Sequence, residues 1–123
     1  MATVELDNTI TLALSVRDRV ASVAWYQKHL GFKLLYHADD AGWSEMKTHT
    51  QGVTVGLGEQ LEPTPGNCVP VFGVPDISVA RAALENSDVR FDGETETIEG
   101  MVSTATFYDP DGNALMLAQD LSK

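Results

Sequence analysis

The sequence predicts an α+β protein in which one order of elements, strand–helix–strand–strand–strand, occurs twice. Residues 9–16 alternate apolar and polar side chains, as a half-buried strand does. In each half, an apolar strand runs into a segment that has a helix-capping residue and helical spacing of apolar residues. The remaining apolar segments are short and separated by Gly- and Asp-containing turns, which favours strands.

The first half, predicted to span residues 8–58, starts with the alternating strand 9–16. Asp18 is a good N-cap and Gly31 suits the position just after a helix end. The residues between them place an apolar face at Val20, Val23, Ala24, Gln27 and Leu30, with Trp25 and Tyr26 assigned to core packing. Strands are then predicted over 32–38, 43–49 and 53–58.

The second half, predicted to span 68–120, follows a Pro-rich polar connector at 59–67. Its elements are a strand at 69–74, a helix opened by Asp76, and strands at 89–94, 101–108 and 114–118. Between the last two strands, the segment Asp109-Pro110-Asp111-Gly112-Asn113 has the composition of a tight turn, which predicts a hairpin. We expect both halves to form one domain over residues 1–123.

Composition excludes several classes of protein. With 43% hydrophobic residues the chain can bury a core, but it has no apolar segment long enough to span a membrane. The N-terminus lacks the features of a secretory signal, and the single Cys68 fits a reducing cytoplasm, where we expect this protein. The net charge is −10, and twelve of the eighteen acidic residues lie in 59–123. Such a surface repels phosphate backbones, so nucleic acid is not an expected partner.

Several motifs together carry a family resemblance. They are the duplicated element order, Val-Arg-Asp at 16–18 against Val-Pro-Asp at 74–76, the Trp25-Tyr26 pair before Leu30-Gly31-Phe32, and the turn at 109–113. The chain resembles the vicinal oxygen chelate superfamily, which includes glyoxalase I, extradiol dioxygenases and bleomycin-resistance proteins. The resemblance implies curved mixed sheets around a cavity, helices on the outer faces, and a cavity built within one chain or between two chains of a homodimer.

Catalytic members of that family hold a divalent metal. The resemblance places one ligand on the first and one on the last strand of each half, at positions matching Thr11, Gly56, Val69 and Met116. None of these residues has an imidazole, carboxylate or thiolate donor, which such metals need in number. We therefore expect neither a metal nor another cofactor at the family position.

The sequence gives less support to catalytic or metal sites built from the three histidines. His37 and His49 flank the hairpin around Trp43, and with Glu45 they would make a metal site outside the family position, although polar strand ends explain them as well. His29 lies near a predicted helix C-terminus, where an imidazolium complements the dipole.

Without a metal, the cavity becomes an apolar small-molecule site with a few polar groups. Trp43 is the strongest recognition candidate because an indole stacks on planar ligands and cations, although a sheet-edge or dimer contact explains it equally well. Gly56, in mid-strand, indicates the close approach of a ligand or partner backbone, or else a bulge. The predicted ligand-binding residues are Thr11, Ala13, Ser15, Trp43, Glu45, Thr54, Gly56, Val69, Val71, Asp92, Glu94, Tyr108 and Met116.

Acidic residues are concentrated in the predicted strand that begins at residue 89. With Phe91 buried, alternation places Asp92, Glu94 and Glu96 on the opposite face, where they form a solvated surface or a negative rim that attracts a cationic ligand. The sequence thus favours a metal-free, homodimeric protein that binds and sequesters a small, cationic or aromatic molecule. The alternatives are a metal-dependent lyase or dioxygenase with displaced ligands, a cofactor-free isomerase using Glu45, and a structural or regulatory subunit with a vestigial cavity.

Overall fold

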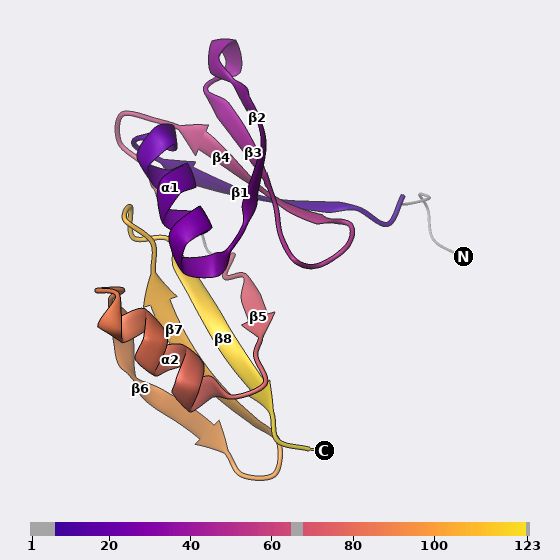
Figure 1. The fold of residues 1–123 in the computed structure, drawn as a ribbon, viewed down its shortest axis with the longest axis vertical. Coiled ribbons are helices and arrows are strands. Elements are labelled where there is room, and N and C mark those ends of the chain that lie inside the picture. The colour runs from indigo at the N-terminus through magenta and orange to yellow at the C-terminus, as the bar shows by residue number, and fades with distance from the viewer. Residues whose placement is uncertain (1–6, 65–67, 123) are drawn as a thin grey trace. The chain divides into compact units, whose positions relative to one another are not determined.

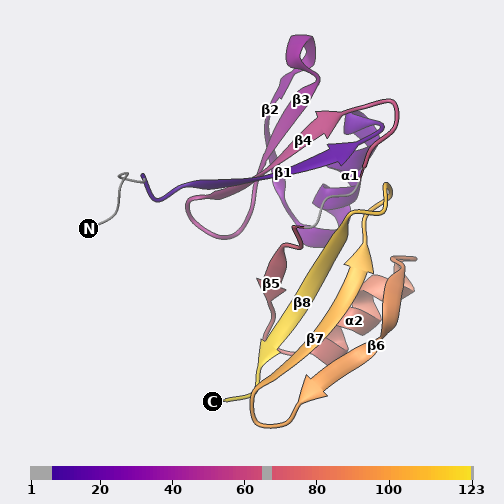
Figure 2. The same ribbon diagram turned by 180° about the vertical axis from the view of Figure 1, so that it is seen from behind.

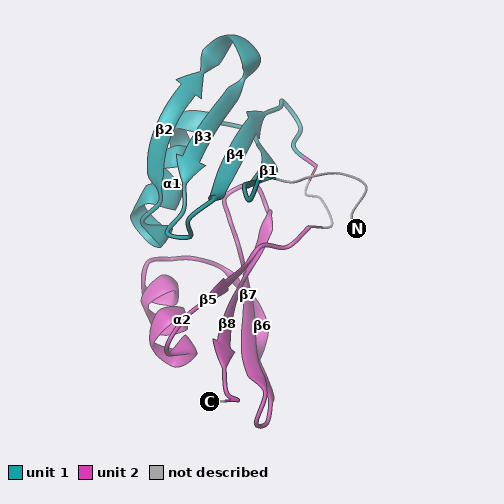
Figure 3. Ribbon diagram, turned by 90° about the vertical axis from the view of Figure 1, so that its right-hand side faces the viewer, with its two compact units in different colours: residues 1–63 teal, residues 64–123 magenta. Residues whose placement is uncertain are grey.

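The computed structural model describes residues 7–64 and 68–122. The chain divides into two compact units, Met1–Pro63 and Thr64–Lys123, which Figure 3 colours separately. Within the described residues, each unit combines one α-helix with a four-stranded mixed sheet. The predicted α+β class with a repeated βαβββ order is therefore confirmed.

Unit 1 contains β1 (Ile10–Val16), α1 (Arg19–Leu30), β2 (Lys33–Ala38), the short 3-10 turn η1 (Asp39–Ala41), β3 (Trp43–Lys47) and β4 (Val53–Glu59). The strands lie in the order β1-β4-β3-β2. Strand β1 is parallel to β4, and the β3 pairings with β2 and β4 are antiparallel. The parallel pairing follows from the chain passing through α1 before it forms the other three strands (Figure 1).

The caps of α1 are those expected from the sequence, but its buried face is not. The Asp18 carboxylate accepts a hydrogen bond from the Ala21 amide, and Gly31 ends the helix with φ +71°. Val20, predicted to be apolar core, is 72% exposed, whereas Arg19 is 8% exposed. The buried positions are Arg19, Ser22, Val23 and Tyr26. The buried face of α1 is thus rotated by about one residue from the predicted face. Arg19 is buried because it has polar partners in η1 and in the sheet that α1 covers.

Unit 2 contains β5 (Val71–Gly73), α2 (Ile77–Asn86), β6 (Phe91–Ile98), β7 (Val102–Tyr108) and β8 (Ala114–Asp120), in the order β5-β8-β7-β6. Asp76 caps α2 as predicted, by accepting hydrogen bonds from the amides of Ser78 and Val79. The first strand is shorter than expected, so Val69 lies before it, and residues 65–67 of the predicted connector lie outside the described residues.

The turn between β7 and β8 is held by a buried carboxylate. Asp109 Oδ1 accepts hydrogen bonds from the amides of Asp111 and Asn113 at 2.9 and 2.8 Å, and Oδ2 accepts one from Asn113 Nδ2 at 2.8 Å. Asp109 is 4% exposed and Asn113 is 3% exposed. The motif therefore closes the hairpin from inside the fold, as its composition predicts.

In each unit the helix covers one face of the sheet, as the two opposite views in Figures 1 and 2 show. The face turned toward α1 buries Leu14, Val16, Met46, Val55 and Leu57, and the face turned toward α2 buries Ala105, Phe107, Leu115 and Leu117. We call the opposite side of each sheet its far face. Because side chains alternate along a strand, the core residues fix which residues lie on the far face.

Strand β6 departs from the predicted alternation. Asp92 pairs with Thr106 and Glu96 with Thr104, so the register shifts between them, and Gly93 has φ +67°. Asp92 and Glu96 lie on the far face of unit 2, as expected, because Thr104 and Thr106 alternate with the buried side of β7. Glu94 lies within the irregular segment and has no strand partner.

No helix in the described part of the chain combines the length and apolar character needed to span a membrane.

Candidate functional site

The far face of unit 1 carries three short rows of side chains across neighbouring strands. Thr54 of β4 pairs with Lys47 of β3 and with Thr11 of β1. Gly56 pairs with Glu45 and Ala13, and Gly58 pairs with Trp43 and Ser15, in the same order. All seven unit 1 residues predicted to bind a ligand therefore lie on one face: Thr11, Ala13, Ser15, Trp43, Glu45, Thr54 and Gly56.

Glu45 is the polar centre of this face. Its Oε1 accepts a hydrogen bond from Trp43 Nε1 at 2.7 Å, and its Oε2 accepts one from Thr54 Oγ1 at 2.5 Å. Thr11 Oγ1 lies 2.8 Å from Thr54 Oγ1 and 3.3 Å from Glu45 Oε2. Glu45 is only 9% exposed, so these donors replace the water that a carboxylate loses on burial.

Trp43 lies directly against Gly56. A Cβ atom built on Gly56 would lie 1.8 Å from Trp43 Cζ2, and one on Gly58 would lie 3.4 Å from Trp43 Cζ3. The indole of Trp43 therefore extends over both glycines. The β3–β4 register is regular, so Gly56 does not lie in a bulge. The space beside Gly56 is filled by Trp43 of the same sheet, and not by a ligand or a partner backbone.

A second aromatic residue on this face is not predicted from the sequence. Tyr36 pairs with Glu45 across β2 and β3, which places it on the far face, and it is 52% exposed. Simple alternation does not predict this position, because the register shifts between Leu34 and Tyr36 and leaves Leu35 as the extra residue. Nothing in the local sequence marks that shift.

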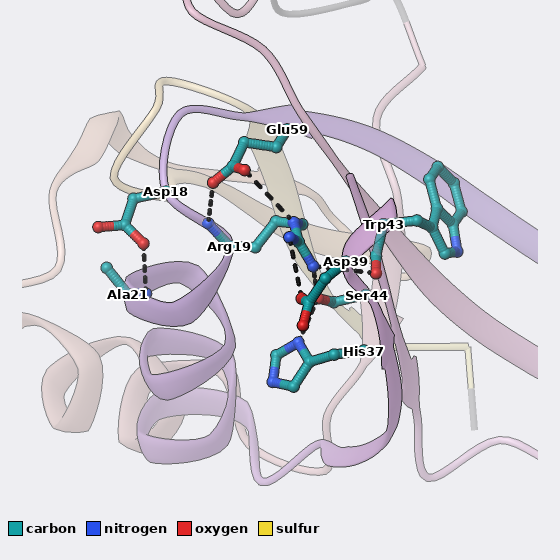
Figure 4. Close-up of polar contacts among 8 residues, drawn as sticks. All are labelled: Asp18, Arg19, Ala21, His37, Asp39, Trp43, Ser44 and Glu59. Atoms are coloured by element: carbon teal, nitrogen blue, oxygen red, sulfur yellow. Dashed lines mark hydrogen bonds and ion pairs between the residues drawn. The ribbon is translucent and has the colours of Figure 1, made fainter. Parts of the chain in front are cut away.

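On the opposite side of the same sheet, the buried Arg19 supports Trp43 (Figure 4). Arg19 Nη1 donates to the Trp43 carbonyl and to Ser44 Oγ, both at 3.1 Å, and Nη2 donates to Asp39 Oδ1 at 3.1 Å. Its Nε lies 3.6 Å from Glu59 Oε1. Trp43 is thus held through its backbone from the helix side and through its indole nitrogen from the far face.

The three histidines do not converge on Glu45. His37 Nδ1 lies 2.6 Å from Ser44 Oγ, on the helix side of the sheet, whereas the Glu45 side chain lies on the far face. His49 Nε2 lies 3.1 Å from the Leu30 carbonyl oxygen, to which it donates. Burial, and then the neighbouring Lys28, lower the pKa of His29, which opposes the charged form expected at a helix C-terminus.

A divalent metal does not fit the donors found at the family position. Thr11 offers a hydroxyl that is shared with Thr54 and Glu45, and the space above Gly56 holds the Trp43 indole. Across residues 7–64 and 68–122, no group of three His, Cys, Asp or Glu side chains has the arrangement to hold a metal ion. Glu45 alone is too few ligands for such an ion.

The predicted residues of unit 2 lie on the far face of their own sheet or at its edge. Met116 pairs with Val71 and with Thr106, which itself pairs with Asp92. Tyr108 lies on the same face, with the Arg90 guanidinium 4.8 Å above its ring. Partial burial, and then the negative charge of Asp92, raise the pKa of Tyr108. Val69 lies before β5 and is 38% exposed.

Comparison with known proteins identifies the family. The sequence profile of the Glyoxalase/Bleomycin resistance protein/Dioxygenase superfamily matches residues 9–117. The chain therefore belongs to this superfamily, as its motifs predict. No curated protein matches it.

Solved structures show the same fold at low identity. A superfamily member from Sphaerobacter thermophilus is 21% identical with a TM-score of 0.77, and the match covers 91% of this chain and 96% of that one. TnmS3, an antibiotic-binding protein from Streptomyces sp. CB03234, is 22% identical with a TM-score of 0.76, covering 98% and 99%. The fosfomycin-resistance protein FosX from Listeria monocytogenes is 14% identical with a TM-score of 0.77, covering 94% of each.

Proposed function

We propose that this protein binds a planar aromatic small molecule on the far face of unit 1 and holds it without converting it. The observation that carries the proposal is the Trp43 indole, which is fixed over Gly56 by its hydrogen bond to Glu45. An aromatic ring that is already immobilised loses little side-chain entropy when a ligand stacks on it. Tyr36, on the same face, adds a second aromatic surface. The antibiotic-binding function of TnmS3 supports a binding role on this fold.

The environment of Glu45 favours binding over catalysis. A general base needs a carboxylate oxygen that reaches the substrate proton. Both oxygens of Glu45 already accept hydrogen bonds, from Trp43 and Thr54, and the side chain is almost fully buried. Because both oxygens are engaged and the side chain is buried, Glu45 is poorly placed to reach a substrate proton, and the cofactor-free isomerase is the weaker alternative. The metal-dependent enzyme is weaker too, because the donors at the family position do not fit a metal.

The experiment that tests this function follows the fluorescence of Trp43. The chain has two tryptophans, so the Trp25→Phe variant reports Trp43 alone. We expect planar aromatic compounds to quench this signal saturably and to be recovered unchanged by mass spectrometry. Conversion of the compound, with or without added Zn²⁺, Ni²⁺, Mn²⁺ or Fe²⁺, would replace the binding role with an enzymatic one. If no compound in a panel of cationic, neutral and anionic aromatics binds, the proposal is wrong.

The attraction of a cationic ligand is a separate proposal, which concerns the far face of unit 2 alone and has its own test. Asp92 and Glu96 on β6 provide negative charge on the far face of that unit. We expect a cationic aromatic to bind to this face of unit 2, and Asp92→Asn to weaken that binding about two- to fivefold at low salt while leaving a neutral analogue unaffected. Glu99→Gln, in the exposed turn between β6 and β7, removes the same charge elsewhere and is the matched control. Equal effects of the two variants would show only a general attraction.

We also propose that the chain forms a homodimer and works in the cytoplasm, where its one cysteine, Cys68, stays reduced. Light scattering on the eluting protein should then give twice the chain mass of 13.3 kDa. A mass equal to one chain would contradict the dimer.

A further inference from the structure

Two lysines face each other at one end of the unit 1 sheet. Lys33 of β2 pairs directly with Lys47 of β3, and both side chains lie on the exposed far face. Within the described residues, neither lysine forms an ion pair. Like charges placed directly opposite on neighbouring strands destabilise a sheet. In a chain with 18 acidic and 8 basic residues, this uncompensated pair needs an explanation.

The two lysines border a small hollow that has no carboxylate. It has a volume of about 220 Å³ and is lined by Gly31, Lys33, Lys47, Thr48 and His49. The His49 ring is fixed there: it donates from Nε2 to the Leu30 carbonyl and packs against Phe32 at a centroid distance of 6.3 Å. Thus Lys33, Lys47 and His49 border a space large enough for a carboxylate or a phosphoryl group.

A groove on the same unit lies beside this hollow, because the two have lining residues in common. Its volume is about 520 Å³, it shares Lys47 and His49 with the hollow, and it extends to Thr54. None of its lining residues is acidic. The nearest carboxylate along β3, Glu45, is engaged by Trp43 and Thr54.

We propose that Lys33 and Lys47, beside the fixed ring of His49, form a binding site for an anionic group, either a carboxylate or a phosphoryl group. The two ammonium groups donate charge-assisted hydrogen bonds to the anion, which also relieves their mutual repulsion. The rest of the ligand extends through the groove toward Trp43, and this part of the inference depends on the proposed function. Together the two sites select an aromatic acid. Capture of a small anion alone does not depend on the Trp43 site.

The test uses titration calorimetry of the whole protein at low salt with acetate and inorganic phosphate, and then with benzoate and phenylphosphonate. We expect saturable binding, with the aromatic member of each pair binding more tightly. Lys33→Gln and Lys47→Gln should each weaken binding about tenfold, as expected for one lost charge-assisted contact. Lys47→Arg, which keeps the charge, should retain binding.

The matched control is Lys28→Gln, which removes an exposed lysine from the last turn of α1 that does not line the hollow. It should change anion affinity less than twofold. An equal loss in Lys28→Gln, or no saturable binding of any of the four anions, would overturn the proposal. Stronger binding of acetate and benzoate assigns a carboxylate, and stronger binding of the phosphorus acids assigns a phosphoryl group. If neutral or cationic aromatics still quench Trp43 while no anion binds, this inference fails and the proposed function stands.

Discussion

The indole of Trp43 occupies the position that a side chain at residue 56 would take. A Cβ there would overlap Trp43 Cζ2 at 1.8 Å, well inside any van der Waals contact. The missing side chain of Gly56 is therefore what allows Trp43 to lie on the sheet. Because the ring also donates to Glu45, its position is set by one steric and one polar constraint.

Adding a methyl group at this contact should displace the indole. We expect Gly56→Ala to destabilise the fold by about 1–3 kcal/mol, since overpacking forces neighbouring groups to move. The change should also reduce aromatic ligand binding at least tenfold. Chemical denaturation and Trp43 fluorescence measure the two effects. Gly58→Ala is the matched control, because its Cβ would lie 3.4 Å from the same ring. If both variants bind ligand normally, the ring does not form the binding surface.

Replacing the carboxylate of Glu45 should loosen the indole of Trp43 without creating a steric clash. Glu45→Gln keeps the size of the side chain but removes its charge and leaves one acceptor oxygen, so the charge-assisted hydrogen bonds from Trp43 and Thr54 cannot both be kept. We expect a loss of about 1–3 kcal/mol in unfolding free energy and a weaker near-ultraviolet circular dichroism signal from tryptophan. Thr11→Val should cost less, since Thr11 Oγ1 lies 3.3 Å from Glu45. A larger effect of Thr11→Val would contradict the assigned network.

Arg19 should matter for stability more than either of its acidic partners. Arg19→Met removes the side-chain donor to the Trp43 carbonyl and one of the two partners of the buried Ser44 hydroxyl, and we expect a loss of about 1–3 kcal/mol. The Asp39 side chain is 81% exposed, so Asp39→Asn should cost less than about 1 kcal/mol. Urea unfolding of both variants tests the ranking. Equal losses would mean that the Asp39 ion pair, rather than the buried hydrogen bonds, stabilises this region.

His29 should make the protein less stable in mild acid. Burial and Lys28 lower its pKa in the folded chain below the ordinary value of 6.5, so the unfolded chain binds a proton more readily. Its stabilising effect is complete above pH 6.5 and is lost as the pH falls through the folded value. The difference in unfolding free energy between wild type and His29→Gln should therefore change over this range. A difference that is independent of pH, or that favours wild type in acid, would contradict the direction of the shift.

Much of the local structure is predictable because it depends on neighbours in the chain. Asp18 and Asp76 cap the amides that follow them, and Asp109 holds a turn through residues two and four positions later. The alternation in residues 10–16 places Leu14 and Val16 in the core. These contacts need only a few consecutive residues, so a single sequence contains the information.

The predicted buried face of α1 and the regular alternation of β6 were wrong for a common reason. Arg19 is buried because Asp39, Ser44 and Glu59, from other elements, supply its partners. The irregular segment of β6 coincides with a long-range contact: Arg81 of α2 donates to the Gly93 carbonyl and to Thr95 Oγ1. Hydrophobic periodicity contains no information about such distant polar contacts.

The sequence by itself determined the repeated element order, the helix caps, the terminal hairpin and the family, because these depend on local hydrogen bonding and on motifs in order. It also placed Trp43, Glu45 and Thr54 on one face by alternation alone. Only the tertiary structure decided that Trp43 lies on Gly56, that a shift at Leu35 turns Tyr36 to this face, and that Lys33 faces Lys47. Each of these depends on the register between separate strands, and a shift of one residue would move every side chain to the opposite face.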